Sequence, residues 1–263
     1  MRTSIQSNLG IKGLLALSLL SVSVPAMAEE ADPPSDITVT GGVSLVSDYR
    51  FRGVSFSAED IAVQGTININ HSSGVYLGTW ASSLEDSAVF GHTEVDLYAG
   101  YATEIAPGTT LDVGLLYYYY PNGDDRAAPV LPATVGVALN SDYFEPYASV
   151  KTTLGPVTAK LGAAYAWDQS ALGSADNIYV FTDLGLGIPA TPISLNAHLG
   201  YSDGALAFGG NYWDWSLGAD WAVGHGLTVG VKYVDSDLNR LTGIPAADTL
   251  YDATVLFTIG ASF

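Results

Sequence analysis

Apolar and polar residues alternate with a period of two in twelve segments, and this pattern restricts the fold more than any other feature of the sequence. Such alternation turns successive side chains toward opposite faces of a β-strand, so each segment has one apolar and one polar face. No apolar-face position of any segment carries a charged residue. The twelve segments are residues 36–51, 60–71, 75–83, 92–105, 109–121, 143–154, 157–167, 178–188, 193–202, 212–223, 227–235 and 250–263.

The connections between these segments alternate between long and short, and the short ones carry Gly or Pro turn signals. Outer-membrane barrels have short periplasmic turns, longer external loops and, in bacteria, an even number of strands. The sequence therefore predicts an all-β fold, a transmembrane antiparallel up-and-down β-barrel of about 12 strands. Many of the acidic residues lie in the predicted external loops: Glu59, Asp60, Glu85, Asp86, Asp124, Asp125, Asp176 and Asp248.

A secreted β-sandwich is the alternative, because it too has an uncharged apolar face that packs against a second sheet. Three features favour the barrel: many segments reach ten residues, the loop lengths alternate, and aromatic residues gather near strand ends. Aromatic girdles of that kind mark the two membrane interfaces. The predicted girdle residues are Tyr117, Tyr119, Trp167, Trp213, Trp215, Tyr251 and Phe263.

Residues 1–28 have the pattern of a cleaved signal peptide. A basic start leads to an apolar run from Leu14 to Val24, which ends at Ala26-Met27-Ala28. The apolar run is about ten residues long, whereas a membrane-spanning helix needs roughly 20. We expect residues 29–36 to be a short linker and residues 37–263 to form the barrel in a Gram-negative outer membrane.

Composition excludes several functional classes. Removal of Arg2 and Lys12 with the signal peptide leaves seven Lys and Arg residues against 27 Asp and Glu, a formal charge of −20. Nucleic-acid binding depends on cationic contacts to phosphates, so nucleic acid is not an expected partner. The chain has no cysteine, and only 14% of its residues are charged while Gly and Tyr are abundant. That mixture suits a barrel with one lipid face and one polar face.

Three stretches resemble a known family: VSDYRFRGVSFSAEDIAVQGTININHSSGVYLGTWASS from Val46, EVDLYAGY from Glu94 and GLLYYYYPNG from Gly114. They are similar to the TorF-type porin family, formerly catalogued as the Gcw conserved hypothetical family. The resemblance implies an outer-membrane channel. The final residues, TVLFTIGASF, are similar to the C-terminal signal that such barrels present to the outer-membrane assembly machinery, here ending in Phe263.

No pattern of catalytic, cofactor-binding or metal-binding residues emerges. The four histidines, His71, His92, His198 and His225, have no helical i, i+4 spacing and no nearby cysteine. An outer-membrane hydrolase stays an alternative, because a Ser–His–acid set is recognised by geometry and not by sequence order. Nothing in the sequence marks such a set, so we predict no enzyme site, no cofactor and no metal.

The polar faces define the predicted pore lining. Inward charges tune the selectivity of a pore, and acids outnumber bases nine to five when Glu104 is included, which predicts a mild cation preference. In the predicted register Arg50 and Arg52 form a basic ladder that faces Glu94 or Asp96; alternatively, they neutralise buried carboxylates and plug the barrel. The predicted pore-lining residues are Asp48, Arg50, Arg52, Glu94, Asp96, Asp112, Tyr118, Glu145, Lys151, Lys160, Asp183, Asp214, Asp220 and Lys232.

These observations favour passive diffusion of small polar solutes across an outer membrane whose lipid surrounds the barrel. The rival is a plugged structural or adhesive barrel that acts through its acidic external loops. Two interpretations of residues 127–139 stay open, a constriction in the mouth and an external loop or hairpin. The sequence predicts neither the solute nor the oligomeric state.

Overall fold

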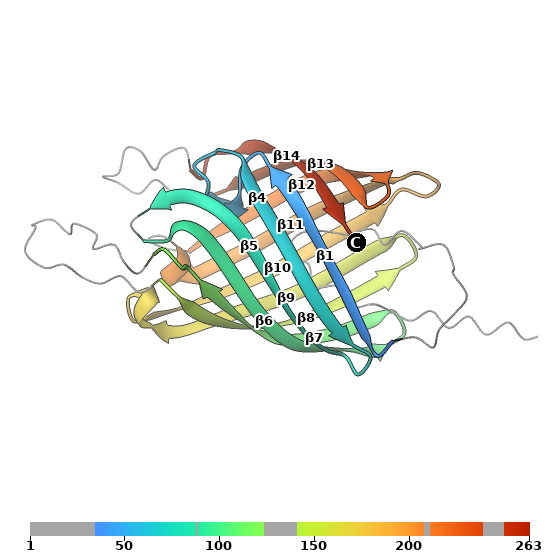
Figure 1. Ribbon diagram of the computed structural model, residues 1–263, viewed down its shortest axis with the longest axis horizontal. Coiled ribbons are helices and arrows are strands. Elements are labelled where there is room, and N and C mark those ends of the chain that lie inside the picture. Colours follow the sequence, from blue (N-terminus) through green and yellow to red (C-terminus); the bar gives the residue numbers. More distant parts are fainter. Residues whose placement is uncertain (1–34, 88, 124–140, 208–210, 239–249) are drawn as a thin grey trace, which may run out of the picture.

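Twelve strands form a closed antiparallel barrel in the computed structural model, which describes residues 35–87, 89–123, 141–207, 211–238 and 250–263 (Figure 1). Among the described residues, the predicted strand number and architecture are confirmed. The barrel strands are β1 Ile37–Val46, β4 Ala62–His71, β5 Val75–Ser87, β6 Gly91–Ala106, β7 Thr109–Tyr119, β8 Tyr143–Leu154, β9 Val157–Gln169, β10 Ala175–Gly187, β11 Ile193–Gly204, β12 Asn211–Gly224, β13 Leu227–Ser236 and β14 Thr254–Ser262.

The barrel closes where the first strand meets the last. Strand β1 pairs with β4 on one side and with β14 on the other, for example through Leu45 and Ile259. Closure gives every strand two partners, so no sheet edge with unpaired N–H and C=O groups faces lipid. Two single-turn 3₁₀ helices, Ser170–Leu172 and Ala205–Ala207, follow β9 and β11.

The predicted apolar faces lie on the outside of the barrel. Ile37, Val43 and Leu45 of β1 are each about half exposed, and Leu217 and Phe257 are more than 60% exposed. Large exposed apolar side chains around a whole molecule suit contact with lipid hydrocarbon. No helix among the described residues is both long enough and apolar enough to cross a membrane.

The two ends of the barrel differ. At the turn end, residues 72–74, 107–108, 155–156, 188–192 and 225–226 connect the strands. The opposite, loop end carries the longer connections (Figure 1). The predicted long connection at residues 82–92 is wrong, because β5 runs on to Ser87 and β6 begins at Gly91. The strand pair continues beyond a register shift between Ser83 and Ser87, so that Ser87 pairs with Gly91 in the region expected to be a loop.

The connection from β1 to β4, residues 47–61, folds into a small hairpin inside the barrel, and we call it the inner hairpin. It contains β2 Arg50–Phe51 and β3 Val54–Ser55, which pair with each other. Arg52 and Gly53 both have positive φ, 49° and 83°, as a two-residue type I′ hairpin turn requires. The prediction that the first barrel strand continues to Phe51 is therefore wrong: β1 ends at Val46.

Candidate functional site

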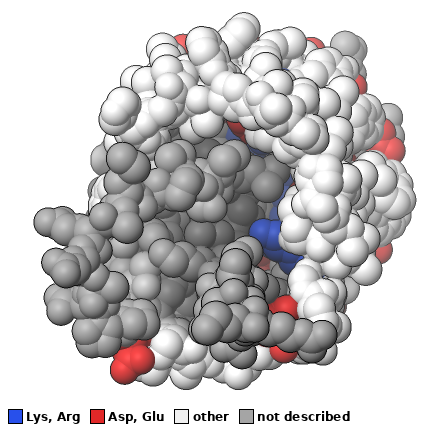
Figure 2. Space-filling model, turned by 90° about the vertical axis from the view of Figure 1, so that its right-hand side faces the viewer, with Lys and Arg blue, Asp and Glu red and all other residues white. Residues whose placement is uncertain are grey.

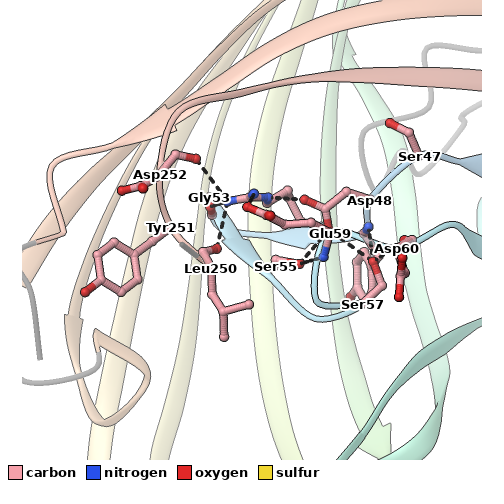
Figure 3. A network of polar contacts seen from close by, with 12 residues as sticks. Ser47, Asp48, Gly53, Ser55, Ser57, Glu59, Asp60, Leu250, Tyr251 and Asp252 are labelled. Carbon is pink, nitrogen blue, oxygen red and sulfur yellow. Dashed lines mark hydrogen bonds and ion pairs between the residues drawn. The ribbon is translucent and has the colours of Figure 1, made fainter. Parts of the chain in front are cut away.

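Asp48 begins the inner hairpin and holds its two arms together (Figure 3). Its Oδ1 accepts hydrogen bonds from the hydroxyls of Ser55 at 2.5 Å and Ser57 at 3.0 Å. The Ser57 hydroxyl oxygen also accepts the Tyr49 backbone N–H at 2.8 Å. The other Asp48 oxygen pairs with Nε of Arg50. Side-chain bonds to nearby backbone compete with a β-ladder, which explains why the strand stops here.

Arg50 fastens the inner hairpin to the segment that precedes β14. Its Nη1 donates to the carbonyl oxygens of Leu250 at 2.7 Å and Asp252 at 3.2 Å. The Ser55 backbone N–H donates to the same Leu250 carbonyl at 2.6 Å. Residues 250–253 thus complete the hairpin network, and the predicted last strand begins only at Thr254. The girdle prediction for Tyr251 is wrong for the same reason, since its side chain is buried.

Arg52 sits at the tip of the inner hairpin and reaches the barrel wall. Its Nη2 lies 2.8 and 2.7 Å from the two carboxylate oxygens of Glu145 on β8. The guanidinium also lies 4.1 Å from the ring centre of Tyr179 on β10, in a cation–π contact. Its own backbone carbonyl accepts the Tyr212 hydroxyl of β12 at 2.9 Å. Three strands, which alternate with β9 and β11 along one arc of the barrel wall, therefore hold one residue.

Tyr49 and Phe51 add aromatic contacts between the inner hairpin and the barrel wall. The Tyr49 hydroxyl donates to Glu94 of β6 at 3.0 Å, and its ring centre lies 5.2 Å from that of Trp80 on β5. Burial raises the pKa of the Tyr49 phenol, and the Glu94 carboxylate raises it further, so the phenol stays protonated and donates. Phe51 meets Tyr118 of β7 edge-on at 5.8 Å.

Together these contacts form a packed layer across the loop-end half of the lumen. We call it the hairpin layer. Asp96 is fully buried in it, and neither of its carboxylate oxygens has a hydrogen-bond partner among the described residues. The layer has more carboxylates than guanidiniums. It consists of the inner hairpin with Trp80, Glu94, Asp96, Tyr118, Glu145, Tyr179, Tyr212 and Asp214.

A chain of polar contacts leads from the hairpin layer toward the turn end. The Tyr179 hydroxyl lies 2.8 Å from Nε2 of His198 and 3.2 Å from Asp214. Nδ1 of the same imidazole lies 2.6 Å from Asp183. The sequence does not reveal the partners of His198, because they stand on neighbouring positions of the barrel wall and not at a short spacing along the chain. Only the strand register brings these four residues together.

The turn-end half of the lumen is more open. Figure 2 views the molecule from this end and shows basic side chains on the inner wall of a hollow. Six charged side chains of the inner faces are half-buried here, three acidic and three basic. We call this group the turn-side vestibule: Asp112, Lys151, Lys160, Asp183, Asp220 and Lys232.

The structure thus divides the predicted pore-lining residues between two places. Glu94, Asp96, Tyr118, Glu145 and Asp214 are buried in the hairpin layer, and the vestibule residues face the turn end. The expected ladder of Arg50 and Arg52 on the barrel wall is wrong. Both belong to the inner hairpin, and neither pairs with Glu94 or Asp96.

Sequence reasoning missed two aromatic members of the hairpin layer. Within the predicted segment 36–51, the alternation places Tyr49 and Phe51 on the apolar face, in line with the apolar side chains of β1. A hairpin alternates in the same way, so periodicity alone cannot separate a straight strand from an inward turn. The Arg52-Gly53 pair was the available signal, since Gly tolerates the positive φ of a tight turn.

Most of the predicted girdle aromatics lie on the outer surface. Tyr119, Trp167, Trp213 and Phe263 are between 39% and 80% exposed, and Tyr117 and Trp215 are half-buried. Tyr117 stacks on Phe144, and Phe144 stacks on Trp167, which joins β7, β8 and β9 near the loop end. Their position relative to a bilayer stays a prediction.

Across the part of the chain that the structure describes, no group of three His, Asp or Glu side chains has a geometry suited to a metal ion. The histidine with acidic partners, His198, lies in the polar chain described above. Residues 127–139, considered as a constriction, lie outside the described residues.

Comparison with known proteins shows the family. Residues 30–263 match the model of a family described as "Bacterial protein of unknown function (Gcw_chp)", and the chain belongs to that family. No curated protein matches the sequence.

Two similar solved structures are porins. The NanC porin has a TM-score of 0.54 and 11% identity, with 86% of this chain and 99% of that chain covered. The KdgM porin has a TM-score of 0.54 and 7% identity, with coverage of 86% and 98%. At such low identity the likeness shows a shared fold, that of outer-membrane porin barrels.

Proposed function

We propose that this member of the Gcw_chp family is a porin-like channel of a Gram-negative outer membrane, of the TorF type, through which small hydrophilic solutes and ions diffuse passively. The inner hairpin is its constriction. The observation that carries this proposal is the set of contacts between the hairpin and strands β5, β6, β7, β8, β10 and β12. A segment held against so many strands controls whatever passes along the lumen.

The exterior supports a membrane location. Apolar side chains are exposed on strand after strand, and a barrel with an apolar outside and a polar inside is the form that outer membranes accept. The lumen is hollowed at the turn end, where charged groups are half-buried (Figure 2). A solute that enters there meets the hairpin layer next.

We also propose the mild cation preference for this channel, with its origin in the hairpin layer. The layer holds five carboxylates against the two guanidiniums of Arg50 and Arg52. Fixed charge at the narrowest point of a pore selects between ions of opposite sign. The carboxylates belong to Asp48, Glu94, Asp96, Glu145 and Asp214.

The test is the single-channel current of refolded residues 29–263 in a planar bilayer with a salt gradient. The double variant Arg50→Ala/Arg52→Ala removes the side-chain bonds of the hairpin to Leu250 and Glu145, so we expect a larger conductance and a reversal potential shifted further toward cations. The matched control is Arg126→Ala/Arg240→Ala. It removes the same charge from two arginines outside the described residues, and we expect currents close to those of the unaltered chain.

Equal changes in both double variants would contradict a constriction at the inner hairpin. A third variant, in which residues 48–60 are replaced by a short Gly-Ser turn, separates channel from plug. A correctly folded barrel with no current even in this variant would favour the second candidate, a structural or adhesive surface barrel. The observation that favours that candidate is the dense fastening of the inner hairpin by both arginines.

A further inference from the structure

All the lysines that follow the signal peptide face the lumen. The chain has three of them, Lys151, Lys160 and Lys232, and each stands on the inner face of its strand in the turn-side vestibule. No lysine lies on the external loops or the outer surface of this strongly acidic protein. Three lysines of the chain thus share one half of one cavity.

Lys151 and Lys160 are direct neighbours. They stand opposite each other on β8 and β9 as register partners on the inner face. Side chains in that relation have Cβ atoms about 5 Å apart, and like charges directly opposite destabilise a sheet. The Lys160 Nζ also lies 5.2 Å from the ring centre of Phe181, which supports the ammonium from one side.

None of the three lysines makes an ion pair among the described residues. The carboxylates of the vestibule are engaged by other donors. The acid that stands opposite Lys160 on β10, Asp183, is 2.6 Å from His198. Asp112 accepts the Tyr76 hydroxyl at 2.6 Å.

On the other side of the vestibule, Asp220 accepts the Asn196 side-chain N–H at 2.7 Å. A wall that used its lysines only for structure would pair them with these acids. Instead, neutral or imidazole donors hydrogen-bond these acids, and the acids act on Lys160 and Lys232 only as nearby charges.

We propose that Lys151 and Lys160 form an anion subsite, which holds the carboxylate or phosphate group of a small solute in the turn-side vestibule. This inference rests on the proposed channel function and names a solute class for it. Two ammonium groups side by side supply several N–H donors, and charge-assisted bonds of this kind are the strong ones. Lys232 stands on β13, away from the pair, and adds only its longer-range field.

A cation-leaning constriction and an anion subsite can coexist in this lumen. Glu145 and Lys151 are both on β8, six residues apart, which corresponds to about 20 Å along the strand. Glu145 is ion-paired with Arg52, and a carboxylate that is paired in this way exerts only a weak field on a lysine so far away. The constriction sets the preference for simple ions, and the subsite selects among solutes that carry an anionic group.

The experiment is equilibrium binding to refolded residues 29–263 in detergent micelles, which needs no conduction. Inorganic phosphate, followed by ³¹P NMR, and succinate, followed by calorimetry, are the two anionic probes. Dimethyl succinate is the neutral control. We expect saturable binding of at least one anion, no binding of the diester, and roughly tenfold weaker binding in Lys151→Gln and in Lys160→Gln. The anion that binds, succinate or phosphate, shows whether the site takes a carboxylate or a phosphate group.

Lys232→Gln is the matched control, because it removes the same charge from the same vestibule outside the pair. We expect it to weaken binding by less than half as much on a logarithmic scale. An equal loss in all three variants, or no binding of either anion, would overturn the subsite. Current without anion binding would refute the subsite alone, and anion binding without current would refute the channel alone.

Discussion

The five lysine and arginine side chains described in the lumen fall into two groups with opposite surroundings. In the hairpin layer Arg50 and Arg52 are both ion-paired: each meets a carboxylate, and each has further backbone or aromatic partners. Nη1 of Arg52 is buried without a hydrogen-bond partner among the described residues. In the turn-side vestibule the lysines have no ion pair, and two of them stand side by side. One half of the same barrel is built as a packed interior and the other as a wall of half-buried charges.

The choice of residue matches this division. Arginine presents planar donors, is weakly hydrated and stacks on aromatic rings, so it suits a buried contact such as that of Arg52 with Glu145 and Tyr179. Lysine is a strongly hydrated point charge on a flexible stem, which suits a wall that exchanges partners. A count of the formal charges along a lumen therefore does not show which charges are already paired within the protein and which can bind a solute.

Removal of the Arg52 side chain is the strongest way to break the packed half. Arg52→Ala leaves the buried Glu145 carboxylate without its cation, and breaking one side of a buried ion pair lowers the free energy of unfolding by about 3–5 kcal/mol. Urea unfolding of the refolded protein in micelles, followed by tryptophan fluorescence, measures it. The double variant Arg52→Met/Glu145→Leu removes both charges and should recover much of the loss.

A loss below about 1 kcal/mol for Arg52→Ala would place this contact in the range of exposed surface pairs. The hairpin layer would then be open to water, and the contrast between the two halves of the lumen would fail.

A smaller effect is expected where a single hydrogen bond is removed from the same layer. Tyr49→Phe deletes the donor to Glu94 and keeps the ring contact with Trp80. The carboxylate is fully buried, so the free energy of unfolding should fall by about 1–3 kcal/mol. The same urea titration measures this difference.

Tyr119→Phe provides the reference on the outer surface, where the ring is 39% exposed. This variant also removes a hydroxyl, and it should change the free energy of unfolding by no more than about 0.5 kcal/mol. Matching losses for Tyr49 and Tyr119 would mean that the Glu94 contact adds nothing to the fastening of the hairpin.

The barrel itself could be predicted from sequence, because lipid forces an uncharged residue onto every second position of a strand. Ile37, Val39, Val43 and Leu45 show that rule, and the structure exposes all four. The lumen faces of the lysines followed from the same alternation. Alternation predicts the face on which a residue lies, but only when the segment is already known to be a strand.

The inner hairpin could not be predicted on that basis. Tyr49 and Phe51 fit a lipid face as well as a packed lumen, since both environments accept aromatic rings. What turns the chain inward is a set of contacts between distant residues: Arg50 with Leu250, 200 positions away, and Arg52 with Glu145. The chain of Asp183, His198 and Tyr179 was missed for a related reason, because its partners meet only through the register of β10 and β11.

The smallest predicted effect concerns the turn-side vestibule, the second half of the comparison. Lys151→Gln relieves the repulsion between two like charges opposite each other, so the free energy of unfolding should rise by about 0.2–1 kcal/mol at low salt. Added salt screens the same repulsion in the unaltered protein and should shrink the difference. Lys232→Gln is the control without a charged cross-strand partner, since Gly218 and Leu256 stand opposite it, and it should show no such gain in stability.

A more stable Lys151→Gln variant that also binds anions more weakly would mean that the two lysines lower the stability of the barrel and are retained because they bind the anion. Destabilisation by Lys151→Gln would mean instead that this lysine has a structural partner, and the two halves of the lumen would then follow the same rule.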